Sequence, residues 1–390
     1  MKKWKLLFFC CWMFVAGWAQ PSDTLSLLER DILLNANKYA LTTWWHTVKG
    51  YGKQQGRYLD WGGNDEHNIR AGGSEAFALA TALRTSVYDA ARTGVSVHDA
   101  TEIALKLIRS GAYRHKANMS GGWGDAWQSA LWASYTGAAG WLLWNKLDEE
   151  DKHLLEKMVE YEADRFLDYS VPYYKDRDGK VIFKGDSKSE ENAWNAMILQ
   201  VAMVMMPSHP HWASWMDKNI ELELSACARP EDVHSTAVIN GRRLCDILGG
   251  SNYNSDGTVI NHGIIHPDYM VCNSLFNVLL FMMAGRPVPA AALYNEDIIY
   301  KRLDSLIYKP GTADVHYPSP NDWGRERKMH FALLDCQAHA FGFDSLSQRK
   351  GDYWEALHAA HVLQMQQRNQ DGSTYQGQKE DNYKGREEWV

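Results

Sequence analysis

Five polar residues in the stretch SDGTVINHGIIHPDYMVCNSL could carry out proton chemistry. They are Asn261, His262, His266, Asp268 and Tyr269. Histidine changes its charge near neutral pH. A tyrosine can act first as base and then as acid when a neighbouring cation lowers the pKa of its phenol from the usual value of about 10. The stretch therefore supplies three candidate catalytic residues, His262, Tyr269 and His266, with Asn261 as a candidate substrate ligand.

The same stretch also has features of a helix start. Asp256 and Gly257 predict a turn, and Pro267 suits the first turn of a helix whose positive dipole end would face the polar cluster. In a purely structural alternative, Asn261 and His266 cap this helix. The histidines would then have no chemical role.

Metal binding is a further alternative for this stretch. His262, His266 and Asp268 carry ligand groups, and two histidines four residues apart share one face of a continuous helix. Gly263 and Pro267 disfavour such a helix. We therefore expect neither a metal nor another cofactor.

A second polar cluster lies in GDSKSEENAWNAMIL, residues 185–199. Its serines and glutamates, Glu191 included, have a structural reason to be there, because serine caps helices and acids complement the helix dipole. Asn192 and Asn195 are middling helix formers three residues apart, so both fall on roughly one helix face. We expect at least one of them to donate a hydrogen bond into a cavity, with Asn192 a candidate catalytic residue and Glu191 and Asn195 candidate substrate ligands.

A third cluster follows the glycines of KANMSGGWGDAWQSALWASY. Glycine lets a backbone approach a ligand closely. The side chains suited to line a saccharide site here are Trp123, Asp125, Trp127 and Gln128. Packing of both tryptophans in the core is the alternative.

A fourth cluster is HYPSPNDWGRERKMH, residues 316–330, a proline-rich loop. Asp322, Trp323 and Arg325 are its candidate substrate ligands, since arginine offers a planar fork that matches a carboxylate. A solvated helix start is the alternative interpretation.

The composition is that of a globular protein with an unusual aromatic content. The 390 residues are 45% hydrophobic and 23% charged, with a net charge of -7, which excludes a disordered chain and gives no support to nucleic-acid binding. There are 17 Trp and 19 Tyr against 11 Phe. Flat aromatic faces with a hydrogen-bonding edge suit sugar rings, although part of this set must fill the core.

The N-terminus, MKKWKLLFFCCWMFVAGWAQ, predicts a signal peptide with cleavage after Ala19. We therefore expect an exported protein, periplasmic or extracellular, with residues 20–390 as one domain. No later stretch has the roughly 18 apolar residues that a membrane span requires. The four cysteines of residues 20–390 show no C-x-x-C spacing, which favours free thiols.

Apolar residues recur at helical spacing in eleven segments and predict a mainly helical chain. Two short hairpins are expected, around Asp178-Gly179 and Asn240-Gly241. So many helices joined by short connections favour an all-α (α/α) toroid, an incomplete (α/α)6 barrel with small β decorations. The final GREEWV predicts the start of one more helix in a C-terminus that is cut short. The predicted helices are 24–48, 73–93, 97–110, 124–146, 149–169, 188–206, 210–228, 267–284, 291–307, 326–342 and 351–369.

On these residues, the chain resembles the helical-toroid polysaccharide lyases, which include chondroitin, hyaluronate and alginate lyases and the heparinase II/III-like enzymes. The motif is DGTVINHG, followed by Tyr269 seven residues after His262, in a tryptophan-rich chain of helical hairpins. The resemblance implies that His262 and Tyr269, together with Asn192 from an earlier helix, surround a uronate. It further implies cleavage by β-elimination of a uronate-containing polysaccharide.

Two other functions fit the same sequence. A glycoside hydrolase on this fold, such as an unsaturated-glucuronyl hydrolase, needs two carboxylates roughly 5–9.5 Å apart. Asp125, Glu191, Asp268 and Asp322 could provide such a pair. A non-catalytic glycan-binding protein is the third possibility. No G-x-S-x-G, G-x-G-x-x-G or P-loop motif is present, so serine-hydrolase and nucleotide-binding functions have no support.

Overall fold

The computed structural model describes residues 23–273, 277–306, 329–343 and 348–375. In this part the chain is mostly helical, and its strands are two residues long and form three antiparallel pairs. The prediction of a mainly helical fold is confirmed.

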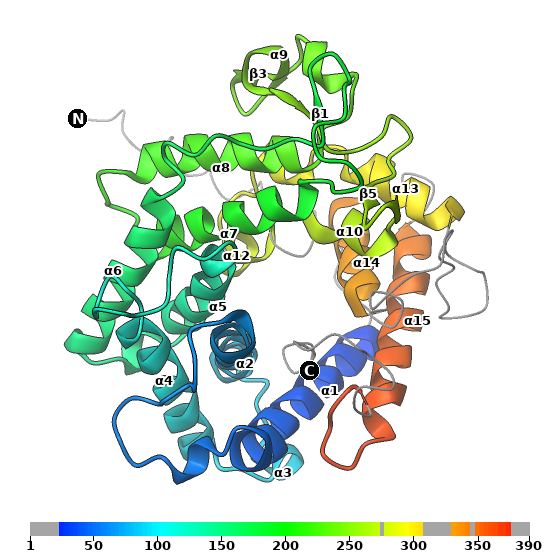
Figure 1. Ribbon diagram of the computed structural model, residues 1–390. Helices are drawn as coiled ribbons and strands as arrows, with labels where there is room; N and C mark the ends of the chain where they lie inside the picture. Colours follow the sequence, from blue (N-terminus) through cyan, green and yellow to red (C-terminus); the bar gives the residue numbers. More distant parts are fainter. Residues whose placement is uncertain (1–22, 274–276, 307–328, 344–347, 376–390) are drawn as a thin grey trace, which may run out of the picture.

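Six helices form two layers in the first two thirds of the chain (Figure 1). Helices α2, α5 and α7 pack in succession nearer the middle of the molecule, and α4, α6 and α8 lie outside them. Burial follows the layers, since α5 and α7 are buried almost all round, whereas α4 buries one face. The helices are α2 (Glu66–Arg84), α4 (Val97–Tyr113), α5 (Ser129–Leu142), α6 (Glu149–Asp164), α7 (Ser189–Met205) and α8 (Trp212–Ala226).

Helix boundaries follow their capping residues. Asp148 caps α6 by accepting a hydrogen bond of 2.9 Å from the backbone N–H of Asp151. The acidic residues that follow Asp148 lie in the first turn of this helix. Helix α2 begins well before the predicted residue 73, because Asp65 is its N-cap. The predicted segment 73–93 is also divided, and its end forms the separate short helix α3 (Ala90–Thr93).

The first and last described helices meet. Helix α1 (Asp23–Tyr39) continues into the π-helix η1 (Ala40–Val48) and packs against α15 (Gln348–Gln367). Hydrogen bonds between residues distant in sequence join this pair, such as that from Asn35 Nδ2 to Gln366 Oε1 at 3.3 Å. Helix α14 (Met329–Phe341) lies against α15 and α13 (Glu296–Leu306).

The segment predicted as one helix over 267–284 is divided in the structure. Helix α10 (Pro267–Met270) is a single turn with Pro267 at its start, as predicted, the backbone turns at Val271 and bends at residues 277–278, and α12 (Leu279–Met283) follows. The apolar run predicted one continuous helix, and the turn at Val271 and the bends at 277–278 interrupt it. A short 3₁₀-helix, η5 (Ala290–Leu293), precedes α13.

The strands only partly match the two predicted hairpins. Strands β2 (Val238–Ile239) and β3 (Arg242–Arg243) pair around the Asn240-Gly241 turn as predicted. Around Asp178-Gly179 the expected hairpin is reduced to one bridge, and β1 (Lys175–Asp176) pairs instead with β4 (Gly250–Ser251). A third hairpin, β5 (Ile260–Asn261) with β6 (Ile264–Ile265), was not predicted.

The predicted free thiols are confirmed, since Cys227, Cys245, Cys272 and Cys336 form no disulfide. Every helix in the part of the chain that the structure describes is too short or too polar to cross a bilayer. The predicted signal peptide and the GREEWV segment lie outside the described residues.

Candidate functional site

The unpredicted hairpin β5–β6 presents His262 at its tip. His262 and Gly263 are the two turn residues, and their φ angles of 51° and 76° are the positive values that a tight two-residue hairpin turn requires. The side-chain oxygen of Asn261 accepts a hydrogen bond of 2.8 Å from the His262 backbone N–H. Histidine tolerates this left-handed conformation better than most residues, so the local sequence N-H-G accounts for the turn.

Backbone hydrogen bonds attach this hairpin to the segment before α7. The Ser187 N–H donates to the Ile260 carbonyl at 2.9 Å, and the Gly263 N–H donates to the Gly185 carbonyl at 3.0 Å. A Cβ on Gly185 would come within 3.1 Å of the Gly263 backbone, and its φ is 73°. Glycine at 185 therefore allows the two segments to lie in contact.

A buried amide, that of Asn252, holds the start of α7. Its oxygen accepts hydrogen bonds from the backbone N–H groups of Lys188 at 3.0 Å and Tyr174 at 2.9 Å. Its nitrogen donates to the Ser225 carbonyl at 2.8 Å. One fully buried side chain thus ties the α7 entrance to the end of α8 and to the loop before β1.

The imidazole of His262 meets the phenol of Tyr269. Nε2 of His262 lies 3.1 Å from Oη of Tyr269, a hydrogen-bond distance. Tyr269 comes from α10, whose position is set in part by the His266 N–H donating to the Val259 carbonyl at 3.1 Å. The turn and the single helical turn therefore bring together two residues that are seven apart in sequence.

His266 supports this pair from the interior. Its ring is fully buried and packs edge-to-face on Tyr269, with ring centroids 4.7 Å apart, and lies 5.5 Å from the His262 ring. His266 therefore packs beside the His262–Tyr269 pair but does not line the pocket. It is positioned to orient Tyr269.

A pocket of about 140 Å3 opens beside the His262–Tyr269 pair. Its walls come from the start of α7, the hairpin, α10 and the loop before α5. The lining residues are Trp127, Asp186, Ser187, Lys188, Glu190, Glu191, Asn261, His262 and Tyr269.

Lys188 is the ammonium of this pocket wall, and it lies between two carboxylates. Its Nζ is 2.8 Å from an oxygen of Asp186 and 3.4 Å from one of Glu191. Burial acts to lower the pKa of Lys188, but the contacts with Asp186 and Glu191 outweigh burial and raise this pKa above its usual value. Lys188 is therefore a permanent cation in the neutral range.

Glu191 is held from its other side by Tyr169. The Tyr169 hydroxyl donates to Glu191 Oε1 at 3.1 Å. Burial, followed by the Glu191 charge, raises the pKa of Tyr169 well above its usual value, so this phenol remains protonated and acts only as a donor here. Glu191 consequently has a fixed orientation at the pocket.

Trp127 forms the outer edge of the pocket. Its side chain is 62% exposed, which is unusual for a large aromatic residue. The ring packs edge-to-face on the buried Trp194, with centroids 5.0 Å apart. A flat apolar surface at the entrance, held by a core residue, is suited to stack against a sugar ring.

Asn192 and Asn195, of which at least one was predicted to face a cavity, both lie away from the pocket. Asn192 is fully buried, and its amide nitrogen donates to the Pro172 carbonyl and to Ser225 Oγ, both at 3.0 Å. Asn195 is also buried and does not line the pocket. Both side chains point into the packing around α7, so the structure does not bring them to the His262–Tyr269 pair.

The cluster before α5 is split between core and surface. Trp123 is buried and donates from Nε1 to the Gly111 carbonyl at 2.9 Å, so it follows the core-packing alternative. Gln128 is buried and accepts a hydrogen bond from Arg70 at 2.7 Å. Asp125 pairs with Lys116 and accepts from the Tyr161 hydroxyl at 2.8 Å, outside the pocket wall. Of this cluster, only Trp127 lines the pocket.

Asp322, Trp323 and Arg325 lie outside the described residues. Conversely, sequence reasoning did not select Asp186 and Lys188 as site residues. A signal for them existed, because they directly precede the polar start of α7. The N-H-G turn that brings β5–β6 against them was read as part of a helix entrance, so the contact between the two segments was missed.

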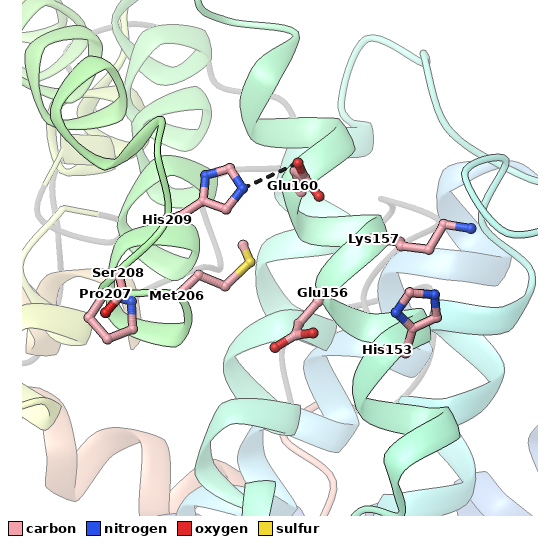
Figure 2. A pocket seen from close by; sticks show the side chains of 8 residues that line it. All are labelled: His153, Glu156, Lys157, Glu160, Met206, Pro207, Ser208 and His209. Atoms are coloured by element: carbon pink, nitrogen blue, oxygen red, sulfur yellow. Dashed lines mark hydrogen bonds and ion pairs between the residues drawn. The ribbon is translucent and has the colours of Figure 1, made fainter.

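A second, larger pocket of about 340 Å3 lies on the outside of α6 (Figure 2). It is lined by His153, Glu156, Lys157, Glu160 and residues 206–209. Figure 2 shows one contact among these side chains, from His209 Nε2 to Glu160 at 3.2 Å. The wall of this second pocket has no phenol beside an imidazole. We therefore take the smaller pocket, beside His262 and Tyr269, as the candidate active site.

Comparison with known proteins adds no relative. No protein-family model, curated protein or solved structure shows a significant match to this chain.

Proposed function

We propose that the protein is an exported polysaccharide lyase that cleaves a uronate-containing glycan by β-elimination. The observation that carries the proposal is the 3.1 Å contact between His262 Nε2 and Tyr269 Oη at the wall of a pocket. An imidazole next to a phenol is a pair that can remove a proton and return it to a leaving group.

The helix arrangement supports an (α/α) toroid for this enzyme. Helices α2, α5 and α7 form an inner row with α4, α6 and α8 outside, and α15 returns to α1. Paired helices that close on themselves bury both helix layers. We propose an incomplete (α/α)6 barrel that forms one domain and has its site at one end of α7.

In the proposed reaction, the Tyr269 phenolate removes the proton on the carbon next to the uronate carboxylate. His262 Nε2 lies within hydrogen-bond distance of that oxygen and can donate to it. The electrons form a double bond as the glycosidic oxygen leaves the neighbouring carbon. Tyr269 then returns its proton to that oxygen, and water is not consumed.

Charge builds on the uronate carboxylate during proton removal. Fixed donors that face this charge contribute the largest share of rate acceleration in such reactions. The Lys188 ammonium and the Asn261 amide are the donors on the pocket wall. The amide hydrogen bonds of Asn261 to Asp186 and to the Ser187 carbonyl are long, 3.4 and 3.3 Å, so a substrate carboxylate can replace them at little cost.

Glycoside hydrolysis is the second candidate, and one observation favours it. Asp186, Glu190 and Glu191 line the same pocket, and two of these carboxylates contact one ammonium. Two acids in one pocket are the minimum for this chemistry. A non-catalytic glycan-binding protein would use the same pocket and Trp127 without turnover.

The products distinguish these functions. We would incubate the protein with a panel of uronate-containing polysaccharides and follow both ultraviolet absorbance and reducing ends. A lyase generates both signals because elimination leaves a conjugated double bond, a hydrolase generates only reducing ends, and a binder generates neither.

The His262→Ala and Tyr269→Phe variants then test the site. We expect each to remain folded and to lose at least about a hundredfold in rate. Matched controls are His234→Ala and Tyr58→Phe, which remove an exposed imidazole and the hydroxyl of a partly exposed tyrosine, neither of which lines the pocket. Full activity in both site variants would exclude the proposed lyase mechanism.

A further inference from the structure

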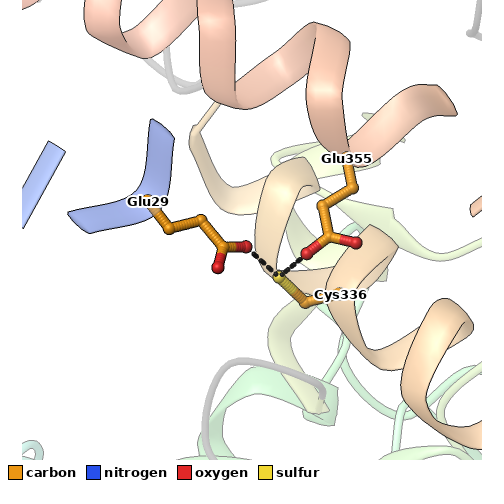
Figure 3. A group of neighbouring side chains, drawn as sticks. All are labelled: Glu29, Cys336 and Glu355. Atoms are coloured by element: carbon orange, nitrogen blue, oxygen red, sulfur yellow. Dashed lines mark hydrogen bonds between the residues drawn. The ribbon is translucent and has the colours of Figure 1, made fainter. Parts of the chain in front are cut away.

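Three metal-ligating side chains from distant parts of the chain converge at the α1–α14–α15 junction (Figure 3). Glu29 comes from α1, Cys336 from α14 and Glu355 from α15. One ligand atom of each lies within 4.8 Å of the others. Figure 3 shows both carboxylates directed at the sulfur.

The ligand atoms are close enough to bind one ion. Cys336 Sγ is 2.7 Å from Glu355 Oε1 and 3.2 Å from Glu29 Oε1. A Zn2+ ion binds thiolate at about 2.3 Å and carboxylate oxygen at about 2.0–2.2 Å. A small relaxation of the three side chains therefore gives room for an ion between them.

The charge of this cluster is not neutralised by lysine or arginine. Among the described residues, neither Glu29 nor Glu355 forms an ion pair with either cation. Buried carboxylates are normally paired with a cation or coordinate a metal. Glu355 is buried and Glu29 is half-buried, so these two carboxylates beside a thiol require bound protons or a metal ion.

His339 fixes the outer side of the cluster. Its Nδ1 lies 3.1 Å from Glu355 Oε2, the oxygen that does not face the sulfur, and its ring is buried. Partners of this kind orient ligand side chains in metal sites. Glu355 thus has one oxygen held by histidine and the other presented to Cys336.

We propose that Glu29, Cys336 and Glu355 bind a Zn2+ ion. A thiolate ligand favours zinc over Ca2+ or Mg2+, which prefer oxygen ligands alone. Binding displaces the thiol proton and any proton held by the carboxylates. The ion then joins the first described helix to the last two, and its function is to stabilise the contact that closes the helix succession.

This role differs from that of the candidate active site, which is built from α7, α10 and the β5–β6 hairpin. The proposed zinc ligands share no residue with the lining of that pocket. The two proposals can therefore fail independently.

The test is metal content and thermal stability of the full mature chain. We would remove metal with a chelator, add Zn2+, dialyse, and measure bound zinc by elemental analysis. We expect about one zinc per chain and a rise of several degrees in the unfolding temperature over the chelated protein, because a ligand that binds the native state stabilises it. Co2+ in place of Zn2+ should give a thiolate-to-cobalt charge-transfer band.

Variants separate zinc binding from simple packing. Cys336→Ser should abolish the cobalt band, because it removes the thiolate. Glu29→Gln should abolish the zinc-induced rise in unfolding temperature. Both results are expected even if the substitution changes the stability of the metal-free protein. Cys245→Ser, at a partly exposed thiol elsewhere, is the matched control and should retain both. A protein that retains no zinc and whose unfolding temperature is the same with zinc and with chelator would overturn the proposal.

Discussion

Polar side chains at the two ends of helix α7 have opposite surroundings. At its N-terminal end, Lys188 and Glu191 line the candidate pocket while also contacting protein partners. Towards its other end, Gln200 is fully buried and donates to Glu223 at 3.0 Å. The Gln200 amide nitrogen is thus used by hydrogen bonds within the protein, whereas the polar groups at the pocket can exchange a protein partner for substrate.

Neighbouring residues on α7 show how sharp this division is. Glu191 lines the pocket, and Asn192, the next residue, is buried against α8. Successive residues of an α-helix are separated by about 100° around its axis. Adjacent positions on α7 therefore face different surroundings, so Glu191 reaches the pocket and Asn192 packs in the interior.

The largest expected effect is at the pocket end. Tyr269→Phe removes the hydroxyl group that His262 contacts at 3.1 Å, and we expect kcat to fall by at least about a hundredfold. The free energy of unfolding should change little, because the ring and its packing on His266 remain. Steady-state kinetics and urea unfolding of the same preparation provide the comparison.

In the packed part of α7, Asn192→Ala should show the reverse. It removes two hydrogen bonds of 3.0 Å and leaves a small buried gap, so we expect a loss of about 2–3 kcal/mol in the free energy of unfolding. The activity per folded molecule should stay within about twofold. A large drop in kcat without a stability change would return Asn192 to the catalytic site.

Trp127→Ala tests the pocket edge. Loss of a stacking surface should lower kcat/KM by about tenfold, since aromatic contacts contribute about 0.5–1.5 kcal/mol beyond their buried area. Stability should remain within about 0.5 kcal/mol because the side chain is mostly exposed. Trp144→Ala, a partly buried tryptophan away from this pocket, serves as the kinetic control. Equal kcat/KM for both variants would remove Trp127 from the substrate path.

Glu223→Gln should have the smallest effect of these substitutions. We expect it to change the free energy of unfolding only above acidic pH. Burial raises the pKa of Glu223 well above its usual value, so the folded chain keeps a proton that the unfolded chain loses above about pH 4.3. This contribution to stability is fully present below that pH and is lost as the pH rises towards the folded pKa. Urea unfolding at several pH values should show a shallower decline for the variant. If the free energy of unfolding fell with pH equally in the wild type and the variant, Glu223 would have the same pKa in the folded and unfolded states.

Much of the helical framework could be predicted from the sequence. Helices α7 and α8 follow the predicted 188–206 and 210–228 closely, because a long apolar periodicity and capping residues specify a helix locally. The start of α2 was missed, since Asp65 supplies the cap and the turns after it are less apolar.

The candidate site was less predictable. His262 and Tyr269 were recognised by residue type, and the structure places them in contact. Asn192 was selected because an amide in an apolar helix suggested a ligand, yet Pro172 and Ser225 use that amide. Its partners lie 20 and 33 residues away in sequence, so no local pattern could reveal them.

The sequence by itself determined the helix-forming segments and the kinds of side chain available for proton transfer, because periodicity and residue chemistry are local properties. Only the tertiary structure decided which polar groups reach the pocket and which are consumed in the core. It also brought Glu29 to Cys336 and Glu355, residues more than 300 positions apart in sequence. Such meetings depend on how buried surfaces pack and on which hydrogen bonds are already satisfied, and neither can be read from neighbouring residues.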